Sequence, residues 1–308
     1  MALDKRYFEY PERSYGMDHG RYDWSMLTDR QAIQWPGDKK LAVWINVGLQ
    51  LYPLDQQGVP FKVPGGMTMP YPDLRHFSLR DYGNRVGIYR FLRAFSRYGV
   101  KPTYAVNTEL AHQNPYLLEA ICRDDHELIC HGWNMDCLHY GGQDKQQEAE
   151  LVAKSVDGLR ELSGEAIRGW LSPAKNQSEH TPELLAANGI DFHCDWVNDD
   201  MPYRFFTDSG DIWSMPLSTE LSDQFILMNN LHSEQSYVEQ ILDATEMLAS
   251  ETTTQGGRIL SLQIHPWMLG QPHRIGKLEQ ILAHLAERDD VWFATASDIL
   301  DTFTSQLK

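Results

Sequence analysis

The strongest constraint on the fold is the regular alternation of short apolar runs with longer amphipathic segments along the chain. Short apolar runs predict buried strands, whereas apolar residues at helical spacing predict helices that pack on a sheet. Strands are predicted at residues 40–47, 103–106, 128–130, 166–171, 191–195, 212–216, 260–264 and 291–295. Helices are predicted at residues 86–98, 115–123, 146–162, 181–188, 234–250, 275–287 and 297–303. Connections of this length favour parallel pairing, so the sequence predicts an α/β fold, a closed or nearly closed (β/α) barrel.

The chain of 308 residues shows no change of composition that would mark a linker between domains. Residues 39–308 are therefore predicted to form a single barrel domain. Residues 1–38 are rich in aromatic, charged and turn residues and predict an extended arm. Residues 48–80 hold five prolines and predict a long loop, which is expected to cover a pocket or to contact another subunit.

Net charge and cysteine content restrict the partners and the location. A net charge of −16 argues against binding to nucleic acid or to an anionic membrane surface. No apolar run approaches the roughly 20 residues that cross a bilayer, and the first residues lack the apolar segment of a secretory signal. The four cysteines form no CxxC pair, so free thiols and a cytoplasmic location are expected.

Three predicted strands end in a polar group beside a tryptophan. Because α/β sheets and barrels bind ligands at the carboxyl ends of their strands, these groups predict one pocket built from several loops. Buried core histidines and core tryptophans are the alternative interpretation. The three sequences are His131-Gly132-Trp133, Arg168-Gly169-Trp170 and His265-Pro266-Trp267.

Five sequence motifs, in this order, carry a resemblance to a known family. They are Tyr82-Gly83-Asn84-Arg85-Val86-Gly87, His131-Gly132-Trp133, Arg168-Gly169-Trp170, the segment from Asp195 to Tyr203, and His265 followed by Gly270-Gln271-Pro272. The chain resembles the polysaccharide deacetylase (NodB-homology) superfamily, and more closely its metal-independent bacterial allantoinase branch. The resemblance extends over most of the chain and implies a distorted, NodB-like (β/α) barrel of about seven parallel strands.

The metal site of the family's hydrolytic deacetylases is not retained in this sequence. Those enzymes carry an Asp-Asp pair after the first strand and a His-x3-His motif, whereas residues 45–50 contain no carboxylate here. His131 matches the first histidine, but the second position is Met135. A tight divalent site needs three or four nitrogen or oxygen ligands, so no metal and no other cofactor is predicted. His131, Asp136 and His139 remain an alternative ligand set, although their spacing matches no standard site.

The resemblance implies that His265 acts as general acid on the leaving group. His131 is then the candidate base or water-orienting group, since neutral imidazole can accept or donate a proton near pH 7. Other residues are predicted to bind the substrate: arginine by paired donors to a carboxylate, and tryptophans as apolar walls. These residues are Asn46, Trp133, Arg168, Trp170, Lys175, Asn176, Glu220, Asp223 and Trp267.

Three functions are compatible with these residues. The first is a metal-independent hydrolase of a non-peptide C–N bond in a small polar amide, ureide or cyclic imide. The second is a lyase or isomerase that acts on a small anionic metabolite by histidine-mediated proton transfer. The third is a non-catalytic binding relative. A small-molecule substrate is expected rather than a polymeric glycan, because the arm and the long loop would narrow the mouth. The allantoinase branch also implies a homo-oligomer.

Overall fold

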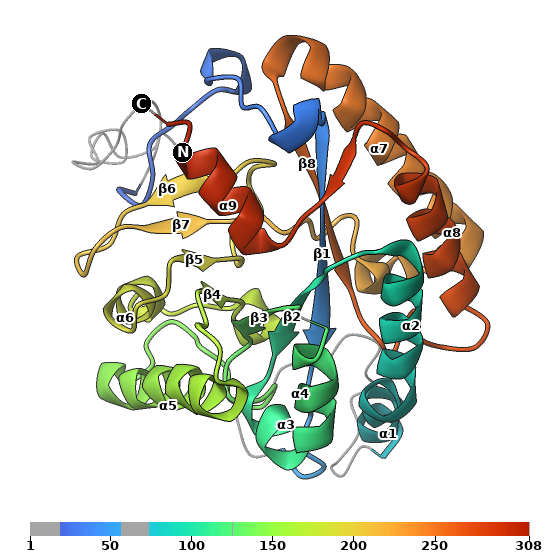
Figure 1. Cartoon of the computed structure of the whole chain (residues 1–308). Coiled ribbons are helices and arrows are strands. Elements are labelled where there is room, and N and C mark those ends of the chain that lie inside the picture. Colours follow the sequence, from blue (N-terminus) through green and yellow to red (C-terminus); the bar gives the residue numbers. More distant parts are fainter. Residues whose placement is uncertain (1–18, 57–73, 125, 308) are drawn as a thin grey trace, which may run out of the picture.

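The computed structural model describes residues 19–56, 74–124 and 126–307, in which one sheet is surrounded by helices (Figure 1). The strands are β1 (Leu41–Leu49), β2 (Thr103–Val106), β3 (Glu127–Cys130), β4 (Gly169–Trp170), β5 (Phe192–His193), β6 (Tyr203–Phe205), β7 (Ile212–Ser214), β8 (Arg258–Ile264) and β9 (Val291–Phe293). The α-helices are α1 (Leu74–Tyr82), α2 (Ile88–Tyr98), α3 (Thr108–Gln113), α4 (Pro115–Cys122), α5 (Lys145–Ser163), α6 (Thr181–Ala187), α7 (Glu234–Gln255), α8 (Ile275–Ala286) and α9 (Ala296–Thr304). Shorter helical segments are η2 (Leu27–Asp29), η3 (Pro36–Asp38), η4 (Gly83–Gly87), η5 (Pro173–Lys175) and η6 (Phe225–Asn229).

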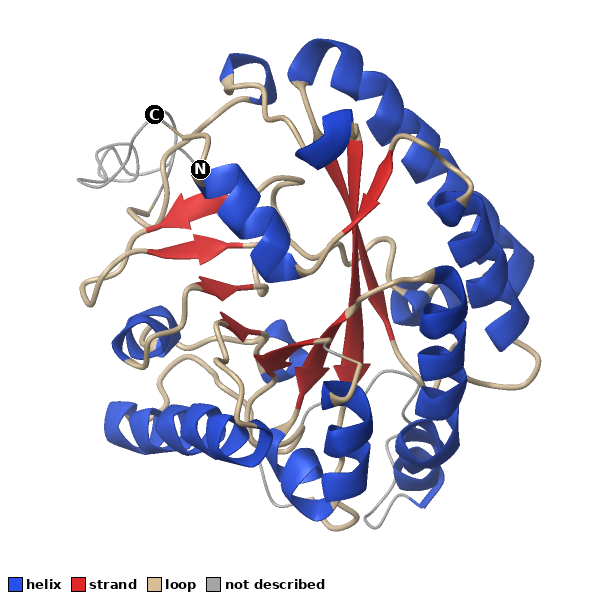
Figure 2. Cartoon of the chain, viewed as in Figure 1, coloured by secondary structure: helices blue, strands red, loops and turns tan. Residues whose placement is uncertain are grey.

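The strands form a mostly parallel sheet that curls into a half-barrel with helices around its outer side (Figure 2). Among the described residues the strand order is β6-β7-β5-β4-β3-β2-β1-β8, and β9 pairs with the amino-terminal part of β1. Every pair is parallel except β6 with β7. The predicted distorted (β/α) barrel is therefore confirmed. The antiparallel strand β6 was not predicted.

Alternate residues of each strand face two different apolar layers, as the pleat of a strand requires. On β1, Val43, Ile45 and Val47 belong to the layer between the sheet and the outer helices. Ala42 and Trp44 belong to the layer inside the barrel. This alternation determines which side chains after each strand can reach the barrel interior.

Helix α9 closes the end of the half-barrel at which the strands begin. Its Ile299 and Phe303 pack in the inner apolar layer. Its first turn is held by Glu127 at the start of β3, which accepts hydrogen bonds from the backbone amides of Ala296 (2.8 Å) and Ser297 (3.0 Å). A carboxylate at a helix amino terminus also interacts favourably with the helix dipole. Apolar side chains of α9 therefore fill the interior at this end of the half-barrel.

The predicted loop over residues 48–80 is shorter in the structure, because α1 begins at Leu74 and continues through η4 into α2. Residues 57–73 of that loop lie outside the described residues, so its predicted role as a cover is not tested. A Cβ atom at Gly87, within η4, would lie 2.1 Å from the carbonyl oxygen of Pro266. Glycine is therefore required where this helical segment meets the loop after β8.

The described part of the predicted arm packs against the barrel. Ile33 forms a bridge with Gly256, and the Trp35 indole donates a hydrogen bond of 2.9 Å to the Arg258 carbonyl. Both Ile33 and Trp35 are buried. Residues 1–18 of the arm lie outside the described residues.

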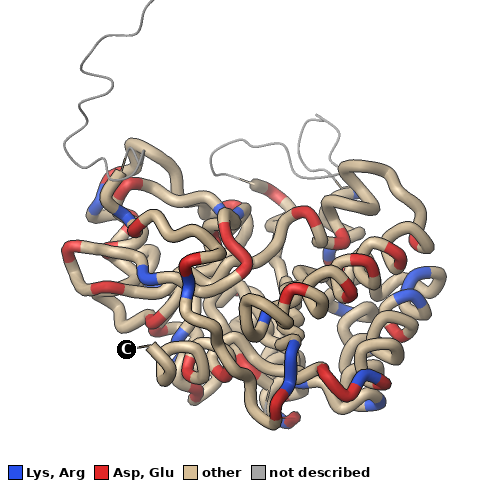
Figure 3. Tube along the Cα trace, turned by 90° about the horizontal axis from the view of Figure 1, so that it is seen from above, with Lys and Arg blue, Asp and Glu red and all other residues tan. Residues whose placement is uncertain are grey.

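Charge is spread over the whole chain. Acidic residues outnumber basic ones by 43 to 27, and both are scattered along the trace (Figure 3). The four cysteines are free. Among the described residues, none of the helices combines the length and apolar character that a membrane span requires.

Candidate functional site

A cavity of about 270 Å³ opens at the carboxyl ends of β1, β3, β4 and β8. It brings together His131, Lys175 and His265, three of the residues that the sequence predicts for the site. The remaining lining residues are neutral: Gln50, Tyr52, Met135, Ser172, Ala174, Thr219, Ser222, Gln224, Phe225, Asn229 and Gln263.

His265 is held by Asp223 in one orientation and one tautomer. Its Nδ1–H donates to Asp223 Oδ1 at 2.7 Å, and its backbone amide donates to Asp223 Oδ2, also at 2.7 Å. Both side chains are buried. Since the carboxylate can only accept, the neutral ring carries its proton on Nδ1 and leaves a lone pair on Nε2. Nε2 has no hydrogen-bond partner among the described residues, so it is available to a water molecule or a substrate.

His131 presents a second imidazole to the cavity, and its hydrogen-bond partners differ from those of His265. Its Nδ1–H donates to the Leu171 carbonyl at 2.7 Å, and its Nε2 faces the Gln50 side-chain amide at 3.3 Å. Burial lowers the pKa of His131 to about 4, and the charges of His265 and Lys175 lower it as well, while the bond to Leu171 opposes the shift. Near pH 7 this ring is therefore neutral, and its Nε2 is a hydrogen-bond acceptor.

Lys175 brings an ammonium group to the same cavity. Its Nζ donates to the Leu217 carbonyl at 2.7 Å and to Thr219 Oγ1 at 3.2 Å. Burial lowers the pKa of Lys175 to about 8, although the charge of Asp195 raises it. Lys175 and Ala174 both have positive φ angles, 54° and 58°, and such strain costs about 1–3 kcal/mol per residue. The loop thus holds a strained backbone where it places this cation.

Gly48 provides the space that the His265 ring fills. A Cβ atom at position 48 would lie 2.8 Å from His265 Cδ2 and 3.0 Å from His265 Nε2. Real Cβ atoms do not approach other atoms so closely, so any side chain here would displace the ring. The resemblance implies a carboxylate in this region of the first strand, and in this chain the imidazole occupies the space.

The side chains around the cavity do not fit the metal site that the resemblance implies for hydrolytic deacetylases. Gly48 supplies no ligand atom, and Met135 offers a thioether that suits zinc poorly. His139, part of the alternative ligand set, is buried and pairs with Glu148 at 2.9 Å. Across residues 19–56, 74–124 and 126–307, no three His, Cys, Asp or Glu side chains are grouped as metal ligands.

The three tryptophans predicted as pocket walls do not line the cavity. Trp170 belongs to the layer under the outer helices. Successive residues of a strand face opposite sides, and Trp170 lies at a position that faces outward. Trp133 packs under Lys154, whose Nζ lies 3.4 Å from the ring centroid. Trp267 packs under the Arg80 guanidinium, 4.3 Å from the ring centroid. These tryptophans pack the structure around the cavity.

Arg168 lies at the opposite end of the half-barrel from the cavity. It precedes β4, and it forms two hydrogen bonds to Asp301 on α9, at 2.9 and 2.7 Å, and one to Asp191 at 2.6 Å. The structure therefore does not bring Arg168 to the cavity that His131 and His265 line. The sequence analysis placed Arg168 at the carboxyl end of a strand. In the structure it lies at the amino end of β4, which begins at Gly169.

The other predicted contacts also lie outside the cavity lining. Asp223 is buried beneath His265 and positions that ring. Glu220 and Asn176 are exposed. Asn46 is buried two residues before Gly48, and its amide has no hydrogen-bond partner in the described part of the chain. Within the described part of the chain, Asp223 is the one of these four whose side chain hydrogen-bonds to a cavity residue.

Several polar residues of the cavity were not predicted. Gln263 and Gln50 line it from β8 and from the end of β1. A pattern in the sequence could have indicated both, since Gln263 precedes His265 by two residues and Gln50 follows Gly48 by two. Residues two apart on a strand face the same side.

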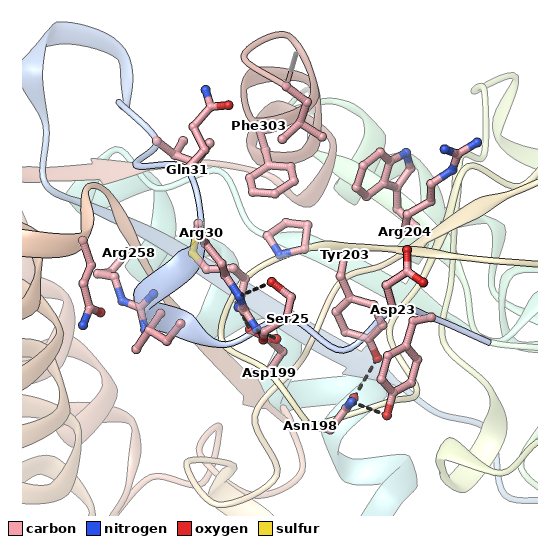
Figure 4. Close-up of a pocket in the computed structure, with 18 of the residues that line it drawn as sticks. Asp23, Ser25, Arg30, Gln31, Asn198, Asp199, Tyr203, Arg204, Arg258 and Phe303 are labelled. Atoms are coloured by element: carbon pink, nitrogen blue, oxygen red, sulfur yellow. Dashed lines mark hydrogen bonds and ion pairs between the residues drawn. The ribbon is translucent and has the colours of Figure 1, made fainter. Parts of the chain in front are cut away.

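A larger cavity, of about 550 Å³, lies between residues 22–33, residues 198–204, the start of β8 and the end of α9 (Figure 4). The three arginines that line it, Arg30, Arg204 and Arg258, are already paired with carboxylates. Arg30 makes two hydrogen bonds of 2.6 Å to Asp199, and Arg258 is ion-paired as well. Among the described residues that line it there is no histidine. We therefore assign the candidate chemistry to the smaller cavity, where two imidazoles and an ammonium converge.

Comparisons with known proteins agree with this fold. Residues 80–193 match the family model described as polysaccharide deacetylase. A protein of Schizosaccharomyces pombe named putative polysaccharide deacetylase is 23% identical over 300 residues, which cover 88% of this chain and 92% of that protein.

Solved structures with the same fold are also similar. A probable polysaccharide deacetylase from Pseudomonas aeruginosa PAO1 has a TM-score of 0.80 and 24% identity, over 88% of this chain and 93% of that one. Puue allantoinase has a TM-score of 0.78 and 22% identity, with the same coverage of both chains. Over residues 80–193 the chain is therefore similar to the polysaccharide deacetylase domain, whose family members hydrolyse amide C–N bonds, and the solved structures of similar fold include both deacetylases and an allantoinase.

Proposed function

We propose that the cavity carries out metal-independent hydrolysis of a non-peptide C–N bond in a small polar amide, ureide or cyclic imide. The observation that supports this most directly is the Asp223–His265 pair, whose Nε2 has no partner among the described residues. An acid–base imidazole needs this arrangement, in which a carboxylate fixes one nitrogen and leaves the other for the reaction. A cavity of about 270 Å³ suits a small molecule better than a polymer.

In the proposed reaction His265 Nε2 accepts a proton from water as the water oxygen attacks the substrate carbonyl carbon. The imidazolium then returns this proton to the leaving nitrogen, while Asp223 stabilises its charge. His131 is neutral near pH 7, because burial lowers its pKa to about 4. Its Nε2, which faces the Gln50 amide at 3.3 Å, accepts a hydrogen bond from the attacking water or a substrate N–H that displaces this amide. One imidazole moves the proton, and the other orients the reactants.

The relatives suggest which compounds to test first. Deacetylases with this domain hydrolyse amides, which favours N-acyl compounds. The neighbour named allantoinase favours cyclic ureides. The expected homo-oligomer and cytoplasmic location belong to the same proposal and rest on the sequence.

A substrate screen read by mass tests the proposal. Allantoin, hydantoin, succinimide and N-acetylated sugars are incubated with the enzyme in ¹⁸O-labelled water, and at least one is expected to gain one labelled water. The variant His265→Asn is expected to lower kcat by about 100-fold or more, the usual effect of losing a general acid–base group. His284→Asn provides a matched control, because His284 lies partly exposed on α8, outside the cavity. It is expected to keep wild-type turnover.

Two outcomes would contradict hydrolysis. A product that forms without incorporation of labelled water would support the lyase or isomerase alternative. Tight binding with no turnover of any compound would support a binding relative. Wild-type turnover in a folded His265→Asn protein would discard the assigned role of this residue.

A further inference from the structure

Among the described residues, the cavity is lined by one ammonium group that forms no ion pair. Within this described lining Lys175 is the one lysine or arginine, and none of the residues is an aspartate or a glutamate. Asp223 is buried, and both of its carboxylate oxygens accept hydrogen bonds from His265. The amides and hydroxyls that make up the rest of the polar lining are neutral.

The Lys175 ammonium retains capacity for a ligand. An ammonium has three N–H donors, and the described residues accept two of them, through the Leu217 carbonyl and Thr219 Oγ1. No carboxylate of the described residues lies within ion-pair distance of Nζ. Asp195, whose charge raises the pKa of Lys175, is hydrogen-bonded to Ser172 and Gln177. A largely buried cation without an ion pair is unfavourable, and an anionic ligand would offset this.

The other nearby cation is directed elsewhere. The Arg80 guanidinium is buried between two rings, 4.8 Å from the centroid of Tyr52 and 4.3 Å from that of Trp267. It does not line the cavity. A negatively charged group on a ligand in this cavity would therefore form its ion pair with Lys175.

We infer that the site takes a small substrate with a carboxylate or an equivalent anionic group, and that Lys175 binds this group while His265 acts on the C–N bond. The inference rests on the proposed function and specifies its substrate class. The strained backbone at Ala174 and Lys175, with φ of 58° and 54°, fits a loop shaped to present the ammonium. The depressed pKa of Lys175, about 8, fits a cation whose counter-ion arrives with the ligand.

A pair of matched ring compounds tests this inference. Hydantoin-5-acetate carries a carboxylate, and hydantoin-5-acetamide is its neutral counterpart of almost the same shape. We expect wild type to bind and turn over the acid at least about tenfold better than the amide. Lys175→Met is expected to weaken binding and kcat/KM for the acid by about 10- to 100-fold, the usual effect of losing a charged hydrogen bond, and to change the amide by less than about threefold.

Two further variants serve as controls. Lys154→Met removes an exposed lysine that packs on Trp133 outside the cavity. This variant is expected to leave binding and kcat/KM unchanged for both the acid and the amide. Lys175→Arg keeps the charge and is expected to keep the preference for the acid. It also keeps the test decisive if Lys175→Met fails to fold.

The outcomes separate this inference from the proposed function. If neither ring is hydrolysed, the proposed function fails for these rings, and calorimetric binding of the acid still tests the role of Lys175. Equal losses for acid and amide in Lys175→Met, a wild-type preference for the amide, or no binding of the acid would each overturn the inference. Hydrolysis of both rings at equal rates would overturn it while leaving the hydrolase intact.

Discussion

His131 and His265 are chemically distinct although both rings line one cavity. The Nδ1–H of His265 is held by the Asp223 carboxylate, which leaves the Nε2 lone pair facing the cavity. The Nδ1–H of His131 is held by the Leu171 carbonyl, and burial lowers the pKa of His131 to about 4. A group that stays neutral near pH 7 is a poor proton donor, so the leaving nitrogen has to receive its proton from His265.

Lys175 sets an expected alkaline limit on activity toward an anionic substrate. Burial lowers the pKa of Lys175 from 10.5 to about 8, so the free enzyme loses this positive charge as the pH rises through about 8. Because the protonated form binds the anion, kcat/KM for hydantoin-5-acetate should fall about tenfold per pH unit above that point. Initial rates at low substrate concentration between pH 6 and 10 measure this limit.

The variant Lys175→Arg identifies the group responsible. A guanidinium stays charged throughout this range, so the alkaline limit should move to higher pH or vanish. A limit that remains near pH 8 in this variant belongs to another group, and the assignment to Lys175 would then be wrong.

At the scale of single elements, strand β1 determines where the reacting imidazole lies. Its inward face runs from Ala42 and Trp44 to Gly48, whose missing side chain leaves room for His265. We expect Gly48→Ala to lower turnover by at least about tenfold, because a shift of about 1 Å in a catalytic group has large effects. The free energy of unfolding should fall by about 1–3 kcal/mol from overpacking. Steady-state kinetics and urea unfolding measure the two effects.

Gly276→Ala is the matched control for this substitution. Gly276 lies in α8, and an added Cβ atom would meet nothing within 4 Å. Turnover should be unchanged, and stability should be equal or slightly higher, because alanine favours a helix. Wild-type activity in Gly48→Ala would show that the His265 ring has more freedom than the close contact indicates.

The sequence predicts the elements with strong apolar patterns and the chemistry at their ends. Continuous apolar runs predicted β1 and β8, and the histidines after β3 and β8 do reach one cavity. The face of each strand was harder to predict. Trp170, for example, points outward. This direction could not be predicted, because short, fully buried strands show no alternation of polar and apolar residues. The pairing of Asp223 with His265 joins residues 42 positions apart, and no local pattern indicates it.

At the scale of the whole molecule, the two ends of the half-barrel have different roles. The cavity lies where the strands end, whereas α9 closes the interior where they begin. Strand β1 alone has nine residues and spans about 30 Å. Charged groups at the closed end, such as Arg168 with Asp301, are therefore far from the reacting imidazoles and serve to hold α9 in place.

This division predicts the behaviour of Arg168→Met. Loss of its partly exposed ion pairs with Asp191 and Asp301 should lower the free energy of unfolding by about 1 kcal/mol or less, because solvent screens such pairs. Values of kcat and KM should stay at those of wild type, in contrast to Lys175→Met. Urea unfolding and steady-state kinetics on the same protein samples measure both. A stable Arg168→Met protein with a KM raised tenfold or more would support Arg168 as a substrate ligand. The substrate would then have to bind at the closed end of the half-barrel as well as in the cavity.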